Sequence, residues 1–194
     1  MLIILTGKTA SGKDTIAARL LAEYPNLKKI LTATSRPKRN NEQNGVDYYF
    51  LTQTEFKNKI QANEFAEYVN YGGNLYGTFK KELEKALDND YIWKIDPSRA
   101  GEVRDFIKRI FPTEVAEKLI KRLMVIYITA SDDDILQRLE KRGLTKKDIQ
   151  KRMADDQRIW QKYQNSYDFI VENTPGQLNQ TINKILSIIE NHRF

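Results

Sequence analysis

Short apolar runs alternate along the chain with stretches in which apolar residues recur every three or four positions. The apolar runs lie at residues 2–5, 91–96, 124–129 and 169–171. Their length and their aliphatic and aromatic composition predict buried strands, and the three-to-four spacing predicts helices between them. Strands that alternate with helices in this way indicate an α/β fold with a parallel sheet.

Two capping signatures locate the starts of helices. Thr52 stands three residues before Glu55, and Ser131 stands three residues before Asp134. A hydroxyl at this distance from an acidic residue is typical of a helix N-terminus, where it accepts a backbone N–H. The first signature lies within residues 32–78, a segment that mixes polar clusters, tyrosines and glycines and that we expect to form a small inserted subdomain.

The composition restricts the chemistry that the chain can perform. Its 194 residues, 40% of them hydrophobic, suit one domain with a substantial core. The absence of cysteine excludes disulfides and thiolate sites, and the single histidine, His192, disfavours a histidine-based triad. No run approaches the roughly 18 apolar residues of a membrane span, and the first run is too short for a signal sequence. We therefore expect a cytoplasmic protein that does not bind membranes.

The chain is basic overall. Its formal net charge is +6, from 32 basic and 26 acidic residues. Such an excess can indicate nucleic-acid binding, but here the basic residues are interspersed with acidic ones. Arginines gathered around the phosphates of a small ligand explain the same excess. We therefore expect a small polyanionic ligand and no nucleic acid.

The segment between the first strand and the first helix reads Gly7-Lys8-Thr9-Ala10-Ser11-Gly12-Lys13. Two glycines five residues apart and a lysine, in a strand–loop–helix context, are typical of a phosphate-binding P-loop. The glycines let backbone N–H groups approach a phosphate, the helix N-terminus adds partial positive charge, and Lys13 can reach the outer phosphates. The alternative is an ordinary turn, and the flanking elements favour nucleotide binding.

The residue after the lysine departs from the usual P-loop pattern. A serine or threonine normally stands there and contributes a hydroxyl to Mg²⁺, whereas this chain has Asp14. The hydroxyl of Thr15 comes one residue later, about 100° further round the helix. Asp14 can bind the metal directly or through water, or it can be only an acidic first-turn residue that the helix dipole favours. Both interpretations stay open.

Five further segments are similar to those of one family. They read TATSRPKR at 32–39, NGVDYYF at 44–50, NEFAEY at 63–68, GNLYGT at 73–78 and RLEKRG at 138–143. In this order behind a P-loop, they resemble the guanylate kinase family over nearly the whole chain. The resemblance implies an enzyme that transfers the γ-phosphoryl group of ATP to GMP with Mg²⁺ as cofactor.

The resemblance also implies the organisation of the chain. We expect a single domain over residues 1–194, in which a three-layer P-loop NTPase core with a parallel sheet carries an inserted GMP-binding subdomain and a helical lid. The core would comprise residues 1–31, 79–130 and 159–194, the GMP-binding subdomain 32–78 and the lid 131–158. The state of association stays open between a monomer and a homodimer.

Several residues match the family's contacts to the GMP phosphate. They are Thr32, Arg36, Arg39, Tyr48 and Tyr76. Planar guanidinium groups and phenolic hydroxyls suit a phosphate monoester. Without the resemblance, the arginines can instead belong to a solvated loop and the tyrosines to the core of the subdomain.

Glu67 and Thr78 match the pair that reads the guanine base in the family. A carboxylate can accept hydrogen bonds from guanine N1–H and from its exocyclic amino group at once, which adenine does not offer, and a threonine hydroxyl can bind the base edge. The alternatives are a surface helix charge for Glu67 and a helix cap for Thr78, since apolar residues follow Thr78 at helical spacing.

Asp96 ends the second predicted strand and resembles the family's acidic residue near the substrates and the metal. The family commonly has another aspartate two residues earlier, where this chain has Lys94, and residues 97–99 also depart from the usual continuation. We therefore place Asp96 in the GMP site and treat Asp14 and Asp96 as the candidate Mg²⁺ ligands.

The resemblance assigns Arg138, Arg142 and Arg152 of the lid to catalysis, together with Lys13. Phosphoryl transfer needs neutralisation of charge on the moving group more than covalent chemistry, so no covalent intermediate is expected. The remaining ATP contacts fall on the P-loop residues up to Thr15 and on Asn173. The alternative for the arginines is a solvated basic helix.

Residues 101–124 are longer than the family's usual connection and carry apolar residues at helical spacing on both sides of Pro112. They can serve packing or an oligomer contact. Two other functions stay open: a P-loop kinase for another nucleoside monophosphate, and a non-catalytic guanylate-kinase-like module that binds a phosphorylated ligand. The presence of Lys13 and of the lid arginines disfavours the second.

Overall fold

The computed structural model describes residues 1–192. Within them, the central sheet has five parallel strands in the order β2-β7-β1-β8-β9. Their bounds are β1 (Leu2–Gly7), β2 (Leu27–Lys29), β7 (Asp90–Lys94), β8 (Leu123–Thr129) and β9 (Phe169–Glu172). The central strand β1 is buried along its whole length, as expected for a strand covered on both faces. The predicted parallel sheet is confirmed.

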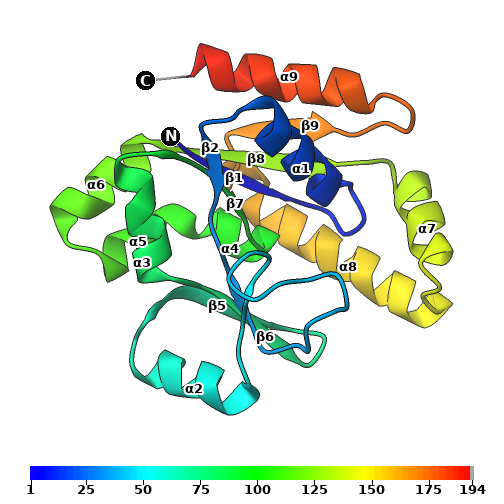
Figure 1. Ribbon diagram of the computed structural model, residues 1–194. Helices are drawn as coiled ribbons and strands as arrows, with labels where there is room; N and C mark the ends of the chain where they lie inside the picture. Colours follow the sequence, from blue (N-terminus) through cyan, green and yellow to red (C-terminus); the bar gives the residue numbers. More distant parts are fainter. Residues whose placement is uncertain (193–194) are drawn as a thin grey trace.

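Helices cover both faces of this sheet and complete a three-layer α/β core (Figure 1). One face carries α1 (Lys13–Glu23) and α9 (Leu178–Asn191). The other carries α3 (Lys80–Glu84), α4 (Pro97–Gly101), α5 (Val103–Ile110), α6 (Thr113–Lys121) and α8 (Lys146–Tyr163), with the 3₁₀ turns η1 (Lys85–Leu87) and η2 (Gln164–Ser166) beside them. No helix of residues 1–192 is long and apolar enough to cross a bilayer.

Two apolar layers result from the alternation of side chains along β1. Ile3 and Leu5 belong to the cluster that includes Ile16 of α1 and residues of α9. Leu2 and Ile4 belong to the cluster formed with α3 to α6 on the opposite face. Because successive side chains of a strand point to opposite faces, one apolar strand serves both layers. The continuous apolar run at the N-terminus therefore reflects burial on both sides.

The long connection between β7 and β8 forms α4, α5 and α6. Their inward faces, which include Phe106 and Leu119, are buried in the cluster on the α3-to-α6 side of the sheet. Pro112 separates α5 from α6, as its ring and missing N–H favour. This burial supports packing, the first of the two purposes considered for the segment.

Residues 33–79 build a second sheet, which lies below the core in Figure 1. Its strand order is β4-β3-β6-β5. The elements are β3 (Ala33–Thr34), β4 (Tyr49–Phe50), α2 (Gln53–Gln61), β5 (Phe65–Tyr71) and β6 (Asn74–Phe79). Phe65 stacks on Phe56 and on Phe79, with ring centroids 4.3 and 4.5 Å apart, and the capping box between Thr52 and Glu55 is present. This small unit thus has a core of its own.

The predicted helix after Ser131 is α7 (Asp132–Lys141), and the Ser131 hydroxyl accepts the N–H of Asp134 at 3.1 Å. Helices α7 and α8 share a small apolar cluster with the P-loop, which includes Ala10 and Leu139. Helix α8 continues to Tyr163, beyond the boundary at residue 158 that we expected for the lid. The lid is therefore joined to the core by an unbroken helix.

One local prediction and one alternative were wrong. The strand predicted over 91–96 ends at Lys94, because Asp96 caps α4 by accepting the N–H of Ser98 at 2.9 Å and Pro97 takes the first helical position. Thr78 is not a helix cap: it lies within β6, and Phe79 precedes α3.

Candidate active site

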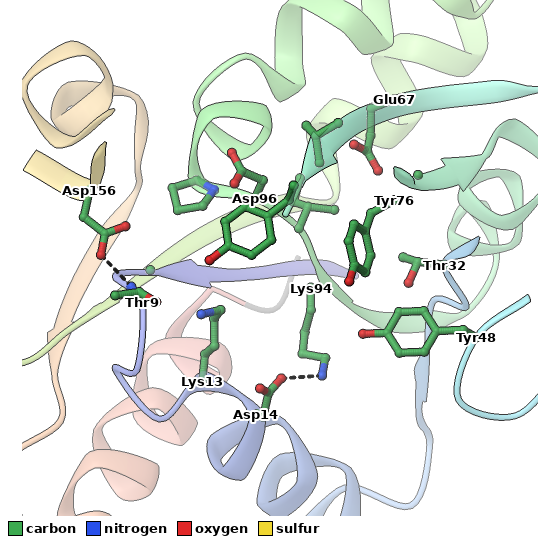
Figure 2. Close-up of a pocket in the computed structure, with 16 residues that line it drawn as sticks. Thr9, Lys13, Asp14, Thr32, Tyr48, Glu67, Tyr76, Lys94, Asp96 and Asp156 are labelled. Carbon is green, nitrogen blue, oxygen red and sulfur yellow. Dashed lines mark hydrogen bonds and ion pairs between the residues drawn. The ribbon is translucent and has the colours of Figure 1, made fainter. Parts of the chain in front are cut away.

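A cavity of about 320 Å³ opens where the carboxyl ends of β1 and β7 face the second sheet (Figure 2). The predicted site residues that line it are Gly7, Thr9, Lys13, Asp14, Thr32, Tyr48, Glu67, Tyr76 and Asp96. The other lining residues are Val69, Tyr71, Gly77, Lys94, Ile95, Pro97 and Asp156. The carboxyl ends of parallel strands are where α/β sheets bind ligands. The P-loop and the residues assigned to GMP therefore share one cavity.

The P-loop depends on its two glycines. A Cβ atom on Gly7 would lie 2.0 Å from the carbonyl oxygen of Ile128 in β8. Gly12 has a φ of +91°, and a Cβ there would lie 2.3 Å from the side-chain nitrogen of Asn173. A larger residue at Gly7 would collide with the Ile128 carbonyl. A larger residue at Gly12 would collide with Asn173 and would be strained in the left-handed backbone conformation, so either change would displace the loop.

Asn173 and Arg138 hold the loop from outside the cavity. The Asn173 side-chain amide donates to the Ser11 carbonyl at 2.7 Å. The Arg138 guanidinium donates to the carbonyls of Ala10 at 3.1 Å and of Asn173 at 3.2 Å. We expected Asn173 near adenine and Arg138 at the phosphates. The structure places both against the loop backbone, and neither lines the cavity.

Charged groups crowd the P-loop end of the cavity. The Lys13 ammonium lies 3.4 Å from the Lys8 carbonyl, and burial lowers the pKa of Lys13 despite the nearby carboxylates of Asp14 and Asp156. Asp156 of α8 accepts the N–H of Thr9 at 2.7 Å. Lys13 is thus a partly dehydrated cation, whose attraction for an anion is stronger than it would be in water.

Asp14 and Lys94 form an ion pair within the cavity, with the carboxylate and ammonium 2.6 Å apart (Figure 2). The cavity walls withhold part of the bulk water from the Asp14 carboxyl, which raises its pKa, but the charge and hydrogen bond of Lys94, with the charges of Lys13 and Arg142, leave the pKa below its usual value. Asp14 lies in the first turn of α1, and Lys94 is the last residue of β7. The pair therefore joins two neighbouring elements of the core.

The donor set around Asp14 fits a Mg²⁺ ion that arrives with a polyphosphate. Mg²⁺ is usually bound by one or two carboxylates together with substrate phosphates and water. The Asp14 side chain is 78% exposed despite its contact with Lys94, so carboxylate surface stays available to a metal. Among the described residues, no group of three acidic or histidine side chains forms a complete metal site. The Asp96 carboxylate, the other candidate ligand, is already bonded to Ser98.

At the other end of the cavity, Tyr48 and Tyr76 lie edge to face with ring centroids 6.5 Å apart. Arg36 packs over the Tyr48 ring, with its guanidinium 5.3 Å from the centroid, and binds Glu42 through two hydrogen bonds of 2.6 and 2.7 Å. The Arg39 side chain is exposed. Thr32 lines the cavity, whereas neither arginine does. An anion here would compete with Glu42 for Arg36.

Glu67 is buried in β5, so the alternative of a surface helix charge was wrong. The Thr78 hydroxyl donates to its carboxylate at 2.7 Å and accepts the indole N–H of Trp93 at 3.0 Å. Burial raises the pKa of Glu67 to about 7, against the opposing effects of the Thr78 hydrogen bond and the charge of Arg99. Thr78 therefore orients the carboxylate, and Glu67 presents oxygen acceptors to the cavity.

The remaining lid arginines make different contacts. Arg142, at the C-terminus of α7, acts electrostatically on both Lys13 and Asp14. The Arg152 guanidinium binds the hydroxyl of Tyr71 and lies 5.2 Å from the centroid of its ring. Because Arg152 belongs to α8 and Tyr71 to β5, this contact joins the lid to the second sheet.

Sequence reasoning missed Tyr71 and Asp156 and noted Lys94 only as a departure from the family pattern. Asp156 stands four residues after Arg152 and therefore on the same face of its helix, a spacing that could have pointed to it. Lys94 precedes Asp96 by two, which places it at the same end of the sheet. For Tyr71 the sequence offered no comparable signal.

Comparison with known proteins relates the whole chain to one family. The guanylate kinase family model matches residues 1–192. The chain is 31% identical to a guanylate kinase of Fusobacterium nucleatum, covering 98% of this chain and 96% of that protein. It is 32% identical to a guanylate kinase of Rickettsia bellii, covering 100% and 95%. The crystal structure of guanylate kinase from Anaplasma phagocytophilum has the same fold, with a TM-score of 0.68 and 21% identity over 100% of this chain and 86% of that one.

Proposed function

Because the chain belongs to the guanylate kinase family, we infer that it transfers the γ-phosphoryl group of ATP to GMP and releases ADP and GDP. The observation that supports this cavity as the site is that the P-loop and the buried Glu67 carboxylate open into it from opposite ends. The P-loop suits the phosphates of the donor, and the carboxylate suits the N–H groups of guanine. The transferred group would pass between them.

The assay that tests this function measures ADP release with ATP and Mg²⁺ and with GMP, AMP, CMP, UMP or dTMP as acceptor. We expect release that depends on GMP. Release that does not depend on the acceptor, or that is fastest with a pyrimidine nucleotide, would contradict the assignment to GMP.

At the donor end, the backbone N–H groups of the P-loop surround the phosphates of ATP and Lys13 binds the outermost of them. Burial lowers the pKa of Lys13, which means that its charged form is poorly stabilised by the protein itself. An anionic ligand that binds beside it stabilises that charge. Arg138 and Asn173 act one step away, by fixing the carbonyls of the loop. Arg142 reaches the transferring group when the lid closes. The contribution of these residues is to position and neutralise phosphate charge.

At the acceptor end, the hydroxyls of Tyr48 and Tyr76 and the guanidinium of Arg36 bind the GMP phosphate, with Arg39 and Thr32 beside them. The support is that both tyrosines and Thr32 line the cavity. Arg36 exchanges Glu42 for the phosphate, which replaces one charge-assisted pair with another. Asp96 lies on the cavity wall between the two ends.

Residues 32–78 form the GMP-binding subdomain and residues 131–158 the lid, on a core made of the rest of the domain. The separate apolar cluster of the second sheet supports the first boundary. The contact of Arg152 with Tyr71 supports joint closure of the lid and the subdomain over the substrates. Arg152 then acts near the phosphates from the closed lid. The cytoplasmic location expected from the composition stays a prediction.

Mg²⁺ supplies charge neutralisation on the ATP phosphates, and we assign the Asp14 carboxylate to it as the protein ligand, directly or through water. If so, Asp14→Ala will raise the Mg²⁺ concentration needed for the half-maximal rate, since the P-loop N–H groups and Lys13 still hold the phosphates. A magnesium titration at fixed ATP and GMP measures this.

Asp14→Ser provides the matched variant, because it restores the hydroxyl that P-loops usually carry. We expect it to need less Mg²⁺ than Asp14→Ala. Identical titration curves for the wild type and both variants would show that Asp14 is only a first-turn residue, worth about 1 kcal/mol or less of stability.

The raised pKa of Glu67 predicts that base binding weakens in acid. Glu67 must be ionised to accept two N–H groups, and with a pKa of about 7 its ionised fraction falls as the pH decreases through that value. Between pH 7.5 and pH 6 the loss in affinity is about eightfold. Calorimetry with guanosine is the measurement, since guanosine lacks the phosphate that titrates near pH 6. Glu67→Gln should remove the pH dependence, and a flat wild-type profile would contradict the prediction.

A further inference from the structure

Lys94 lines the cavity. It extends from the end of β7, and Figure 2 shows its ammonium beside Asp14, with Lys13 on one side and Tyr48 on the other. Lys94 acts electrostatically on both Lys13, at the donor end, and Tyr48, at the acceptor end. Its ammonium therefore lies where the two phosphate-binding ends of the cavity meet.

Two other lysines lie within electrostatic range of Lys94. Lys94 repels both Lys13 and Lys29, and nearby carboxylates, which include Asp14, Asp156 and Asp47, offset part of this repulsion. Asp14 is the carboxylate in direct contact with the Lys94 ammonium. The repulsion that remains between Lys94 and the other two lysines decreases when a polyanion enters.

Phosphoryl transfer brings such a polyanion to this point. The phosphate of GMP and the terminal phosphate of ATP each carry up to about two negative charges, and they must approach each other in line. Their mutual repulsion is largest between the donor and acceptor ends, where a fixed cation reduces it.

We propose that Lys94 binds the acceptor phosphate on the side that faces ATP, and that Asp14 positions its ammonium there. This inference rests on the proposed function. It gives a purpose to the lysine that stands where the guanylate kinase pattern commonly has an aspartate. It also links that lysine to the second departure, Asp14 after the P-loop lysine, because the two residues form one ion pair.

The test measures the binding of GMP and of guanosine by calorimetry, without ATP and without Mg²⁺. Lys94→Met removes the charge from a side chain of similar shape. Because this change also leaves Asp14 facing the phosphate unpaired, Lys94→Met is made in the Asp14→Asn background and compared with Asp14→Asn alone. The amide oxygen of asparagine still accepts the hydrogen bond of the Lys94 ammonium, so this background keeps Lys94 in place. We expect GMP affinity to fall tenfold or more and guanosine affinity to stay unchanged. Lys94→Arg should retain most of the GMP affinity.

Lys28→Met is the control for a general loss of positive charge, since Lys28 is exposed on β2 outside the cavity; GMP affinity should not change in it. Equal GMP affinity with and without Lys94 would overturn the inference, as would a parallel loss of guanosine and GMP binding, which indicates a structural role. In either case, a wild type that still binds guanosine and phosphorylates GMP keeps the proposed function. A wild type that binds neither ligand refutes that function and the inference with it.

Discussion

At pH 8, where Glu67 with its pKa of about 7 is mostly ionised, GMP is expected to exceed AMP as phosphoryl acceptor by at least about two orders of magnitude in kcat/KM. The reason is the buried Glu67 carboxylate, whose oxygens accept from guanine N1–H and from the guanine amino group. AMP presents an unprotonated N1 at the same place, so the carboxylate and the base would both lose hydrogen bonds in a dehydrated pocket. Initial rates of ADP release over a range of acceptor concentrations measure the ratio.

Glu67→Gln should reduce this ratio sharply, because an amide donates one hydrogen bond and accepts another and so matches neither base fully. Its matched control is Glu64→Gln, which neutralises a carboxylate on the same segment that pairs with Lys59 and does not line the cavity. Similar rates with GMP and AMP in the wild type would contradict guanine recognition by Glu67.

Arg142→Ala is expected to lower kcat by about two to three orders of magnitude while changing the KM for GMP little. Arg142 is assigned to the transferring phosphoryl group, on which charge is redistributed in the transition state, so its interaction is stronger there than in the ground state. Arg39→Ala should do the reverse and chiefly raise the KM for GMP. Steady-state kinetics with both substrates varied separate the two effects.

The control for the lid is Arg158→Ala, which removes an exposed arginine of α8 that pairs with Asp155. Arg138→Ala should differ from both groups, because Arg138 binds the carbonyls of Ala10 and Asn173 and its loss weakens the P-loop itself. We expect lower affinity for ATP together with lower turnover. Unchanged kinetics in the Arg39 and Arg142 variants would mean that these two arginines are solvated surface groups.

The sequence predicted the features that depend on neighbouring residues. The apolar run of β1, the glycines of the loop and the periodicity of α1 lie within the first 23 residues, and each specifies its own local structure. The capping residues Thr52 and Ser131 located their helices for the same reason. The alternation of strands and helices then predicted the parallel sheet, since only a few connections between such elements are physically allowed.

The sequence could not predict the pairings between distant residues. Asp14 and Lys94 are separated by 80 positions, and each was considered alone as a departure from a pattern. Thr78 was expected to bind the base, but the structure shows its hydroxyl engaged by Glu67 and Trp93. These contacts depend on how the second sheet packs against β7, which local periodicity does not determine.

The bond from Trp93 to Thr78 gives the protein an internal optical sensor of its base site. The chain has two tryptophans, and the other, Trp160, packs against Tyr127 and Tyr167. With Trp160 replaced by phenylalanine, the remaining indole is connected through a single hydroxyl to the carboxylate that binds guanine. Its fluorescence then follows occupancy of the base pocket in real time, without a label and without turnover.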